Sequence, residues 1–157
     1  MNLNRTITFT MNGKKKEIAV DVRQSLLEVL REQLGMISVK QGCAVGECGA
    51  CTVLIDGKAR PACITLAATC DGRAVETVEG LARDGHLSAL QRAFHERLGV
   101  QCGFCTPGMI IAAEALLRDN ARPDEVAIRD ALSGNLCRCT GYVKIIEAVQ
   151  AAAEVQS

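Results

Sequence analysis

The sequence is poor in aromatic residues and has no excess of charge. Its 157 residues include three Phe, one Tyr and no Trp, and eighteen basic residues balance eighteen acidic ones. So few aromatic side chains argue against a platform for stacking nucleic-acid bases and against an aromatic-lined ligand pocket. A net charge of zero gives no indication of a nucleic acid or a membrane surface as partner.

Targeting segments and nucleotide-binding motifs are also missing. The first residues, MNLNRTITFT, are polar and do not form the basic and then apolar stretch of a secretory signal peptide, and no apolar run approaches transmembrane length. The sequence therefore predicts a cytoplasmic protein without a membrane span. It contains no Walker motif, no G-x-G-x-x-G and no convincing Ser/His/Asp arrangement, so no catalytic residue is assigned to this chain.

Cysteine, in contrast, is abundant, and eight of the nine cysteines fall into two blocks with the spacing of metal ligands. The first block is a C-x4-C-x2-C pattern closed by a fourth cysteine: Cys43, Cys48, Cys51 and Cys63. This is the spacing of a plant-type ferredoxin [2Fe–2S] site. A zinc site with four cysteines favours C-x2-C pairs, so the longer first gap favours iron–sulfur. In a reducing compartment, an odd number of cysteines also argues for metal ligation over disulfides.

The second block combines C-x2-C with C-x-C: Cys102, Cys105, Cys137 and Cys139. Each pair directly precedes a threonine at a predicted helix start, Thr106 or Thr140, and Thr106 is expected to cap its helix. The partial positive charge at a helix N-terminus favours thiolates. Spacing alone leaves both zinc and iron–sulfur open for this block. Cys70 fits neither block and is interpreted as a small hydrophobic residue.

The first half of the chain predicts a small α+β unit. Asn12-Gly13 and Asp56-Gly57 are turn dipeptides that favour β-hairpins. A helix is expected over 26–34, ended by Gly35. The predicted strands are 7–10, 16–20, 52–55, 58–63 and 75–78.

The second half predicts only helices, over 88–98, 107–118, 124–133 and 142–154. The expected organisation is a domain over residues 1–77, a connector over 78–87 and a helical domain over 88–157. The predicted fold class is therefore α+β.

Three motifs resemble a known family. These are GCAVGECGACT at 42–52, QCGFCTPG at 101–108 and GNLCRCTGY at 134–142, and they are similar to the iron–sulfur subunit of molybdenum hydroxylases, the xanthine oxidase family. The resemblance implies a plant-type ferredoxin-like (β-grasp) domain followed by an all-α four-helix-bundle domain, each with one [2Fe–2S] cluster. It also implies two partners, a large molybdopterin-binding catalytic subunit and a medium FAD subunit.

The resemblance also assigns roles to residues. The first block would hold the outer cluster, and the second block the cluster nearest molybdenum. Gln101 and Cys139 would lie against the molybdopterin. Electrons would pass from molybdenum through the helical-domain cluster and the ferredoxin-like cluster to flavin or another acceptor. The substrate would bind on the large subunit, and small subunits of xanthine or purine dehydrogenases and of 4-hydroxybenzoyl-CoA reductase both look similar. An N-heterocycle or an aromatic acyl-CoA is therefore expected.

Two other classes of protein stay open from the sequence. One is a free-standing ferredoxin-like electron carrier, which should have no large exposed apolar surface. The other is a zinc-stabilised interaction module, which would contain no iron.

Overall fold

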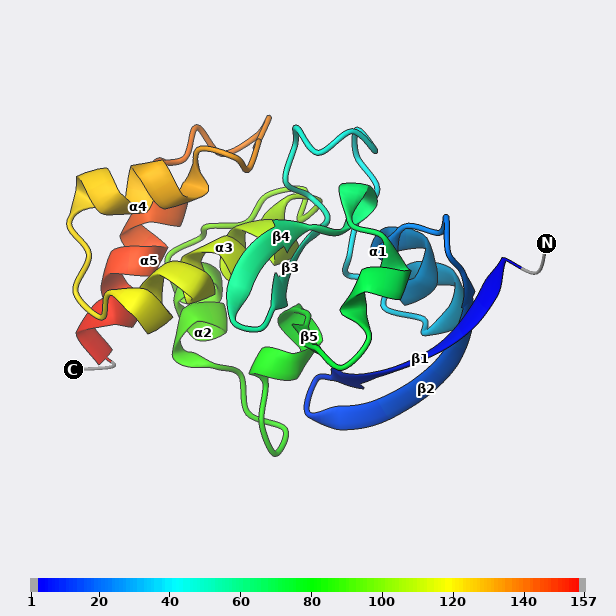
Figure 1. Ribbon diagram of the computed structural model, residues 1–157. Helices are drawn as coiled ribbons and strands as arrows, with labels where there is room; N and C mark the ends of the chain where they lie inside the picture. The colour runs from blue at the N-terminus through cyan, green and yellow to red at the C-terminus, as the bar shows by residue number, and fades with distance from the viewer. Residues whose placement is uncertain (1–2, 156–157) are drawn as a thin grey trace.

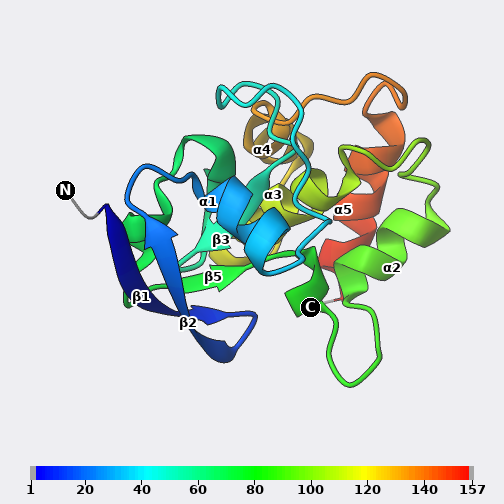
Figure 2. The ribbon, with the colours of Figure 1, turned by 90° about the vertical axis from the view of Figure 1, so that its right-hand side faces the viewer.

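The computed structural model describes residues 3–155 (Figure 1). The ends of the two predicted domains, residues 1–2 and 156–157, lie outside the described residues. A mixed sheet with short helical turns forms the N-terminal part, and four helices form the C-terminal part beside it (Figures 1 and 2). The predicted α+β class, with a ferredoxin-like part followed by a helical part, is confirmed. Within residues 3–155, no helix is both long and apolar enough to cross a membrane.

The sheet has five strands in the order β2-β1-β5-β3-β4. Strands β1 and β5 run parallel, and the other neighbours are antiparallel. The strands are β1 (Asn4–Met11), β2 (Lys14–Asp21), β3 (Thr52–Ile55), β4 (Lys58–Pro61) and β5 (Ala74–Glu76). Both predicted hairpins are present, β1–β2 and β3–β4.

Both hairpin turns have the backbone that their dipeptides predict. Asn12 and Gly13 have φ values of 48° and 78°, and Asp56 and Gly57 have φ values of 50° and 78°. Two central residues with positive φ define the type I′ turn, whose twist matches that of the flanking strands.

Two predicted strands end earlier than expected. β4 stops at Pro61 and the chain then forms the 3₁₀ turn η2 (Ala62–Ile64), which carries Cys63. β5 stops at Glu76, and Val78 begins the 3₁₀ turn η4 (Val78–Leu81). A further 3₁₀ turn, η3 (Ala67–Cys70), lies between them.

The predicted first helix is present but changes type midway. Ser25 and Glu28 form a capping box at the start of α1 (Leu26–Glu28), which continues as the π-helical turn η1 (Val29–Gln33). Gly35, with φ of 68°, then ends the helix as predicted. The Met36 amide donates to the Leu30 carbonyl at 2.8 Å across this end.

The four predicted C-terminal helices are confirmed. They are α2 (Ala89–Glu96), α3 (Thr106–Asp119), α4 (Glu125–Leu132) and α5 (Val143–Val155). The predicted cap at Thr106 is wrong, because Cys105 occupies the N-cap position and Thr106 is already helical. Pro107 lies in the first turn of α3, where its missing N–H costs nothing.

Strand β3 is buried on both faces and is shared by two hydrophobic cores. Val53 and Ile55 pack with the sheet and the α1 segment. Leu54, on the opposite face, packs with α3 and the other C-terminal helices. Because side chains alternate along a strand, a fully apolar strand can join two cores in this way.

A bidentate ion pair also joins the two parts. Two guanidinium nitrogens of Arg118, on α3, donate to the Glu76 carboxylate of β5 at 2.8 and 3.0 Å. The third, Nε, donates to Glu114 at 3.0 Å. The hydrogen bond from Arg118 lowers the pKa of Glu76 below its ordinary value of 4.5.

We expect Leu54→Ala to destabilise the protein by about 2–5 kcal/mol, since it leaves a cavity where β3 meets α3. Leu54 is 0% exposed, whereas Leu87 is 50% exposed and provides the control Leu87→Ala. The apparent Tm, followed by far-UV circular dichroism at one heating rate, should fall only for the first variant. Equal Tm values for the two variants would contradict the shared core.

We expect Glu76→Gln to lower stability at pH 7 by about 1 kcal/mol, because Arg118 loses its bidentate ion pair and keeps only the carboxylate of Glu114 as a charged partner. A carboxyl with a lowered folded pKa stabilises above its unfolded pKa of 4.5, and this stabilisation is lost as the pH falls through the folded value. Tm values of the wild type and the variant should therefore converge below pH 4.5. Glu125→Gln, in the exposed Glu125–Arg129 pair, is the control and should change Tm little.

Candidate metal centres

The first block (Cys43, Cys48, Cys51 and Cys63) and the second block (Cys102, Cys105, Cys137 and Cys139) are called the first and second cysteine sets from here on. Residues 36–51, drawn in cyan, carry Cys43 and Cys48, and residues 133–142, drawn in orange, carry Cys137 and Cys139. Both loops lie at the top of both ribbon views (Figures 1 and 2). Cys51 directly precedes β3, and Cys63 lies in η2. Cys102 and Cys105 occupy the loop that leads into α3.

The Cys43 sulfur is surrounded by backbone donors. It accepts N–H groups from Val45 at 3.4 Å, Glu47 at 3.3 Å and Cys48 at 3.4 Å. These amide hydrogen bonds, with one from the Cys48 thiol, lower the pKa of Cys43 to about 6. The positive φ of Ala44 (59°) and Gly46 (84°) bends the loop so that its amides face the sulfur.

The other two thiols of the first set also form a pair. Burial, together with the interaction with the Cys63 thiol, raises the pKa of Cys51 to about 11. A hydrogen bond joins these two side chains. The first set therefore consists of the pairs Cys43–Cys48 and Cys51–Cys63.

The second set has the same arrangement, with the pairs Cys105–Cys137 and Cys102–Cys139. Burial, together with the nearby Cys137 and Cys102 thiols, raises the pKa of Cys105 to about 12. A hydrogen bond with Cys102 raises the pKa of Cys139.

Thr140 acts on Cys137 in the opposite direction. Its hydroxyl donates to the Cys137 sulfur at 3.1 Å and its amide does so at 3.4 Å. Burial acts to raise the pKa of Cys137, but these two donors outweigh it and lower the pKa.

The paired arrangement of the thiols suits a binuclear centre. A [2Fe–2S] cluster takes two thiolates on each of its two irons, so two neighbouring pairs of thiols suit it. Sulfur atoms that accept hydrogen bonds from amides and hydroxyls are also suited to bind metal as thiolates.

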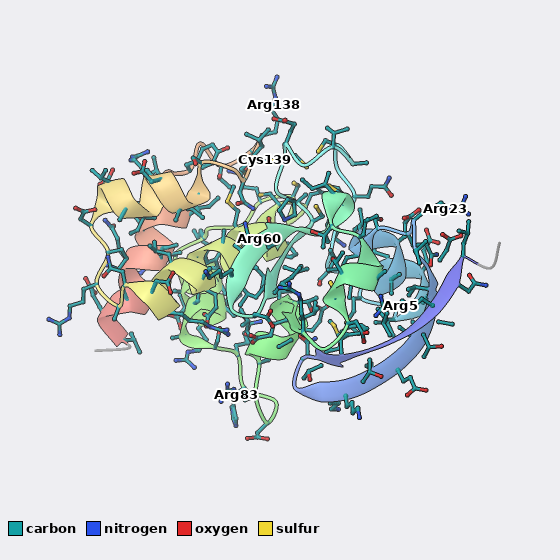
Figure 3. The ribbon with its side chains drawn as sticks, in the orientation of Figure 1. Arg5, Arg23, Arg60, Arg83, Arg138 and Cys139 are labelled. Carbon is teal, nitrogen blue, oxygen red and sulfur yellow. The ribbon has the colours of Figure 1, made fainter. Side chains whose placement is uncertain are left out.

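The two residues expected to contact molybdopterin lie on the exposed side of the second set. Cys139 and Cys102 are exposed, and Gln101 is exposed next to Cys102 in the chain. Arg138 points away from the protein above Cys139 (Figure 3). The structure thus brings Gln101 and Cys139 to one surface. Cys70 is 0% exposed in the hydrophobic core formed by the sheet and the α1 segment, and it belongs to neither set.

Tyr142 positions the Cys137 loop and was not singled out from the sequence. Its hydroxyl accepts the Cys137 amide at 2.8 Å and donates to the Asn135 carbonyl at 3.2 Å. The sequence places Thr140 only near the start of the last predicted helix. Both residues lie within the GNLCRCTGY motif, which is the one sequence signal that points to them. Their contacts with Cys137 depend on how the loop folds.

Two family models match the chain. A "2Fe-2S iron-sulfur cluster binding domain" matches residues 9–82, and a "[2Fe-2S] binding domain" matches residues 77–150. Their boundary coincides with the change from strands to helices.

Curated relatives match along nearly the whole chain. The nicotinate dehydrogenase small FeS subunit of Eubacterium barkeri is 50% identical, and the alignment covers 95% of each chain. The xanthine dehydrogenase iron-sulfur-binding subunit of Escherichia coli O157:H7 is also 50% identical, over 95% of this chain and 96% of the relative.

Solved structures agree. A chain of quinoline 2-oxidoreductase from Pseudomonas putida 86 superposes with a TM-score of 0.94 at 44% identity, and the match covers 98% of this chain and 96% of that one. Aldehyde oxidoreductase from Desulfovibrio gigas gives a TM-score of 0.93 at 42% identity; 97% of this chain corresponds to 17% of that longer chain.

We expect Tyr142→Phe to loosen the Cys137 loop while keeping the ring in place. The Cys137 amide and the Asn135 carbonyl lose their shared partner, which should cost about 1 kcal/mol. Hydrogen–deuterium exchange of the peptide containing residue 137 should become faster, while the α2 peptide in the same sample serves as an internal control. Unchanged exchange at residue 137 would show that the hydroxyl does not hold the loop.

Proposed function

The chain belongs to the iron–sulfur subunits of the molybdenum hydroxylases, the xanthine oxidase family, and we propose that each of its two cysteine sets holds one [2Fe–2S] cluster. The observation that carries this proposal is the grouping of eight thiols into four neighbouring pairs, two pairs in each set. The chain is the electron-transfer subunit of a heteromeric oxidoreductase, and the substrate chemistry takes place on another subunit.

Each set would supply all four ligands of its cluster. The outer cluster would be held by Cys43, Cys48, Cys51 and Cys63, and the other by Cys102, Cys105, Cys137 and Cys139. When bound, a [2Fe–2S] cluster supplies a centre that accepts and releases one electron at a time. The amides around Cys43 and the Thr140 hydroxyl on Cys137 would stabilise the added negative charge, because hydrogen bonds to sulfur favour the reduced state.

The chain pairs with a large molybdopterin-binding subunit, and we propose that Gln101 and Cys139 face the cofactor there. Their exposure on one surface supports this arrangement. Apolar residues are exposed along the same segments, with Phe104 48%, Leu136 58% and Val143 56% exposed. Such a surface favours a subunit interface over a free-standing carrier.

We also propose a medium FAD subunit as the electron acceptor. The support is that a relative, 45% identical, is the gamma subunit of caffeine dehydrogenase of a Pseudomonas species, a name that implies further subunits.

The proposed substrate of the assembled enzyme is an N-heterocycle. Three relatives at 50% identity are named for nicotinate, nicotine and xanthine, which share this chemistry. The aromatic acyl-CoA suggested by the sequence stays a prediction. A cytoplasmic location is proposed because a reducing compartment favours cysteines as metal ligands over disulfides, and the odd number of cysteines agrees with this.

The domain boundaries are proposed at residues 1–77 and 88–157, joined by the connector 78–87. The two hydrophobic cores support this division. Leu81, in the connector, packs with the helical core, so the connector would move with the second domain.

The native holoenzyme should contain about four irons and four acid-labile sulfides per copy of this chain, two for each cluster. Dithionite reduction should give two distinct S = 1/2 signals in low-temperature EPR. Cys51→Ala and Cys105→Ala should each remove about half of the iron and one of the two signals. Cys70→Ala changes a buried cysteine outside both sets and should leave both signals.

An iron-free preparation that contains zinc would contradict the proposal. A wild type with one iron–sulfur signal and one zinc per chain would demote the second set to a structural zinc site.

A further inference from the structure

The two cysteine-bearing loops meet at one buried point. Gly49 lies between Cys48 and Cys51 of the first set. Asn135, two residues before Cys137, packs against it and is only 5% exposed. Gly108, in the first turn of α3, approaches the same peptide from the helical part. We call these three residues, Gly49, Gly108 and Asn135, the inter-loop junction.

Hydrogen bonds hold the junction together. The Asn135 amide nitrogen Nδ2 donates to the Gly49 carbonyl at 2.9 Å and to the Thr52 hydroxyl at 3.3 Å. The Thr52 hydroxyl donates to the same Gly49 carbonyl at 2.7 Å. Next to it, the Leu136 amide donates to the Cys48 carbonyl at 2.9 Å. One side chain and one backbone amide of the second loop therefore bind two carbonyls of the first.

The junction is also packed too tightly for a methyl group. A Cβ added at Gly108 would lie 2.3 Å from the Gly49 oxygen. A Cβ added at Gly49 would lie 2.4 Å from the Gly134 oxygen and 2.6 Å from Asn135 Nδ2. The two loops are thus as close as their backbones allow, and glycine is required on both sides of the contact.

We propose that Asn135 is a positioning residue that sets the separation between the two cysteine sets, and that Gly108 provides the space for it. This inference rests on the proposed function, since separation matters only if both sets hold clusters. The Asn135 side chain donates to Gly49 and Thr52 and not to a cysteine sulfur. It therefore acts on the backbone between Cys48 and Cys51, and it precedes Cys137 by two residues in the chain.

The reason for such a residue lies in the distance dependence of electron transfer. The rate of tunnelling between two centres falls steeply as they separate, so a loosened junction slows the relay without changing either ligand set. Loops are the mobile parts of a fold. The buried Asn135 amide fixes the spacing of the two loops, because its N–H group would be costly to leave unpaired if they moved apart, whereas the Gly49 carbonyl would keep its bonds from Thr52.

Two variants perturb the junction from opposite sides. Asn135→Ala removes the donor that ties the loops together. Gly108→Ala inserts a methyl group between α3 and the Gly49 carbonyl, at a helical position where alanine itself is favourable. Gly134→Ala is the matched control, because a Cβ there meets nothing within 4 Å although it lies beside Asn135. Asn120→Ala, at an exposed asparagine, controls for the loss of an amide.

The readout is the magnetic interaction between the two reduced centres in the holoenzyme. Two S = 1/2 centres split each other's low-temperature EPR signals by an amount that falls with the inverse cube of their separation. Asn135→Ala and Gly108→Ala should retain the iron and sulfide content of the wild type but lose part of this splitting. Both controls should keep the wild-type splitting.

Full splitting in both junction variants would overturn the inference. Loss of iron in both junction variants, with iron retained in the controls, would also overturn the inference. The junction would then be needed to form a cluster site and would not merely set the distance between two sites. If only Asn135→Ala loses iron, the test rests on Gly108→Ala: reduced splitting would support the inference, and full splitting would overturn it. A wild type that lacks two iron–sulfur signals would instead refute the proposed function, so the two failures are distinguishable.

Discussion

The Gly49 carbonyl is the point on which the two halves of this protein converge. It accepts hydrogen bonds from Asn135 and Thr52 and lies against Gly108, so the first cysteine loop, the second cysteine loop and the start of α3 all meet at one peptide. Because Thr52 begins β3, the same point is also anchored in the sheet. Strand β3 then extends the connection by placing alternate side chains in two cores. The placement of both cysteine sets therefore depends on one densely packed contact between parts that are far apart in sequence.

Within each cysteine set, the thiols experience opposite environments. Amide donors lower the pKa of Cys43, whereas burial raises that of Cys51. Thr140 lowers the pKa of Cys137, whereas burial raises that of Cys105. In the first set these two thiols belong to different pairs, so a bound binuclear centre would have a hydrogen-bonded side at Cys43 and a buried side at Cys51. In the second set Cys105 and Cys137 form one pair, so the contrast lies within that pair. Since hydrogen bonding and solvent exposure set the potential of such centres, the donors to Cys43 and Cys137 would favour the reduced state of a bound cluster.

Much of this organisation could be predicted from local sequence. Asn12-Gly13 and Asp56-Gly57 specify their turns by backbone preference alone, and Gly35 ends its helix. The cysteine spacing predicts two sets of metal ligands. The features that the sequence does not predict depend on tertiary contacts. The π-helical turn at Val29–Gln33 has no local motif, and the cap at Cys105 in place of Thr106 follows from how the loop enters α3. Asn135 and Tyr142 look like ordinary polar residues of a loop until the fold brings Gly49 and Cys137 beside them.

The exposed surface around the second cysteine set favours contact with another subunit. Cys102 and Cys139 are exposed, and Phe104, Leu136 and Val143 leave apolar surface along the same segments. An anionic thiolate centre open to water would be vulnerable to oxidation, and exposed apolar side chains are unfavourable in an isolated subunit. A large subunit that covered this surface would remove both problems at once and, under the proposed arrangement, would bring its cofactor to Gln101 and Cys139. The first set is less exposed, since Cys51 is buried and Cys43, Cys48 and Cys63 are half-buried, so a cluster there would depend less on cover from a partner.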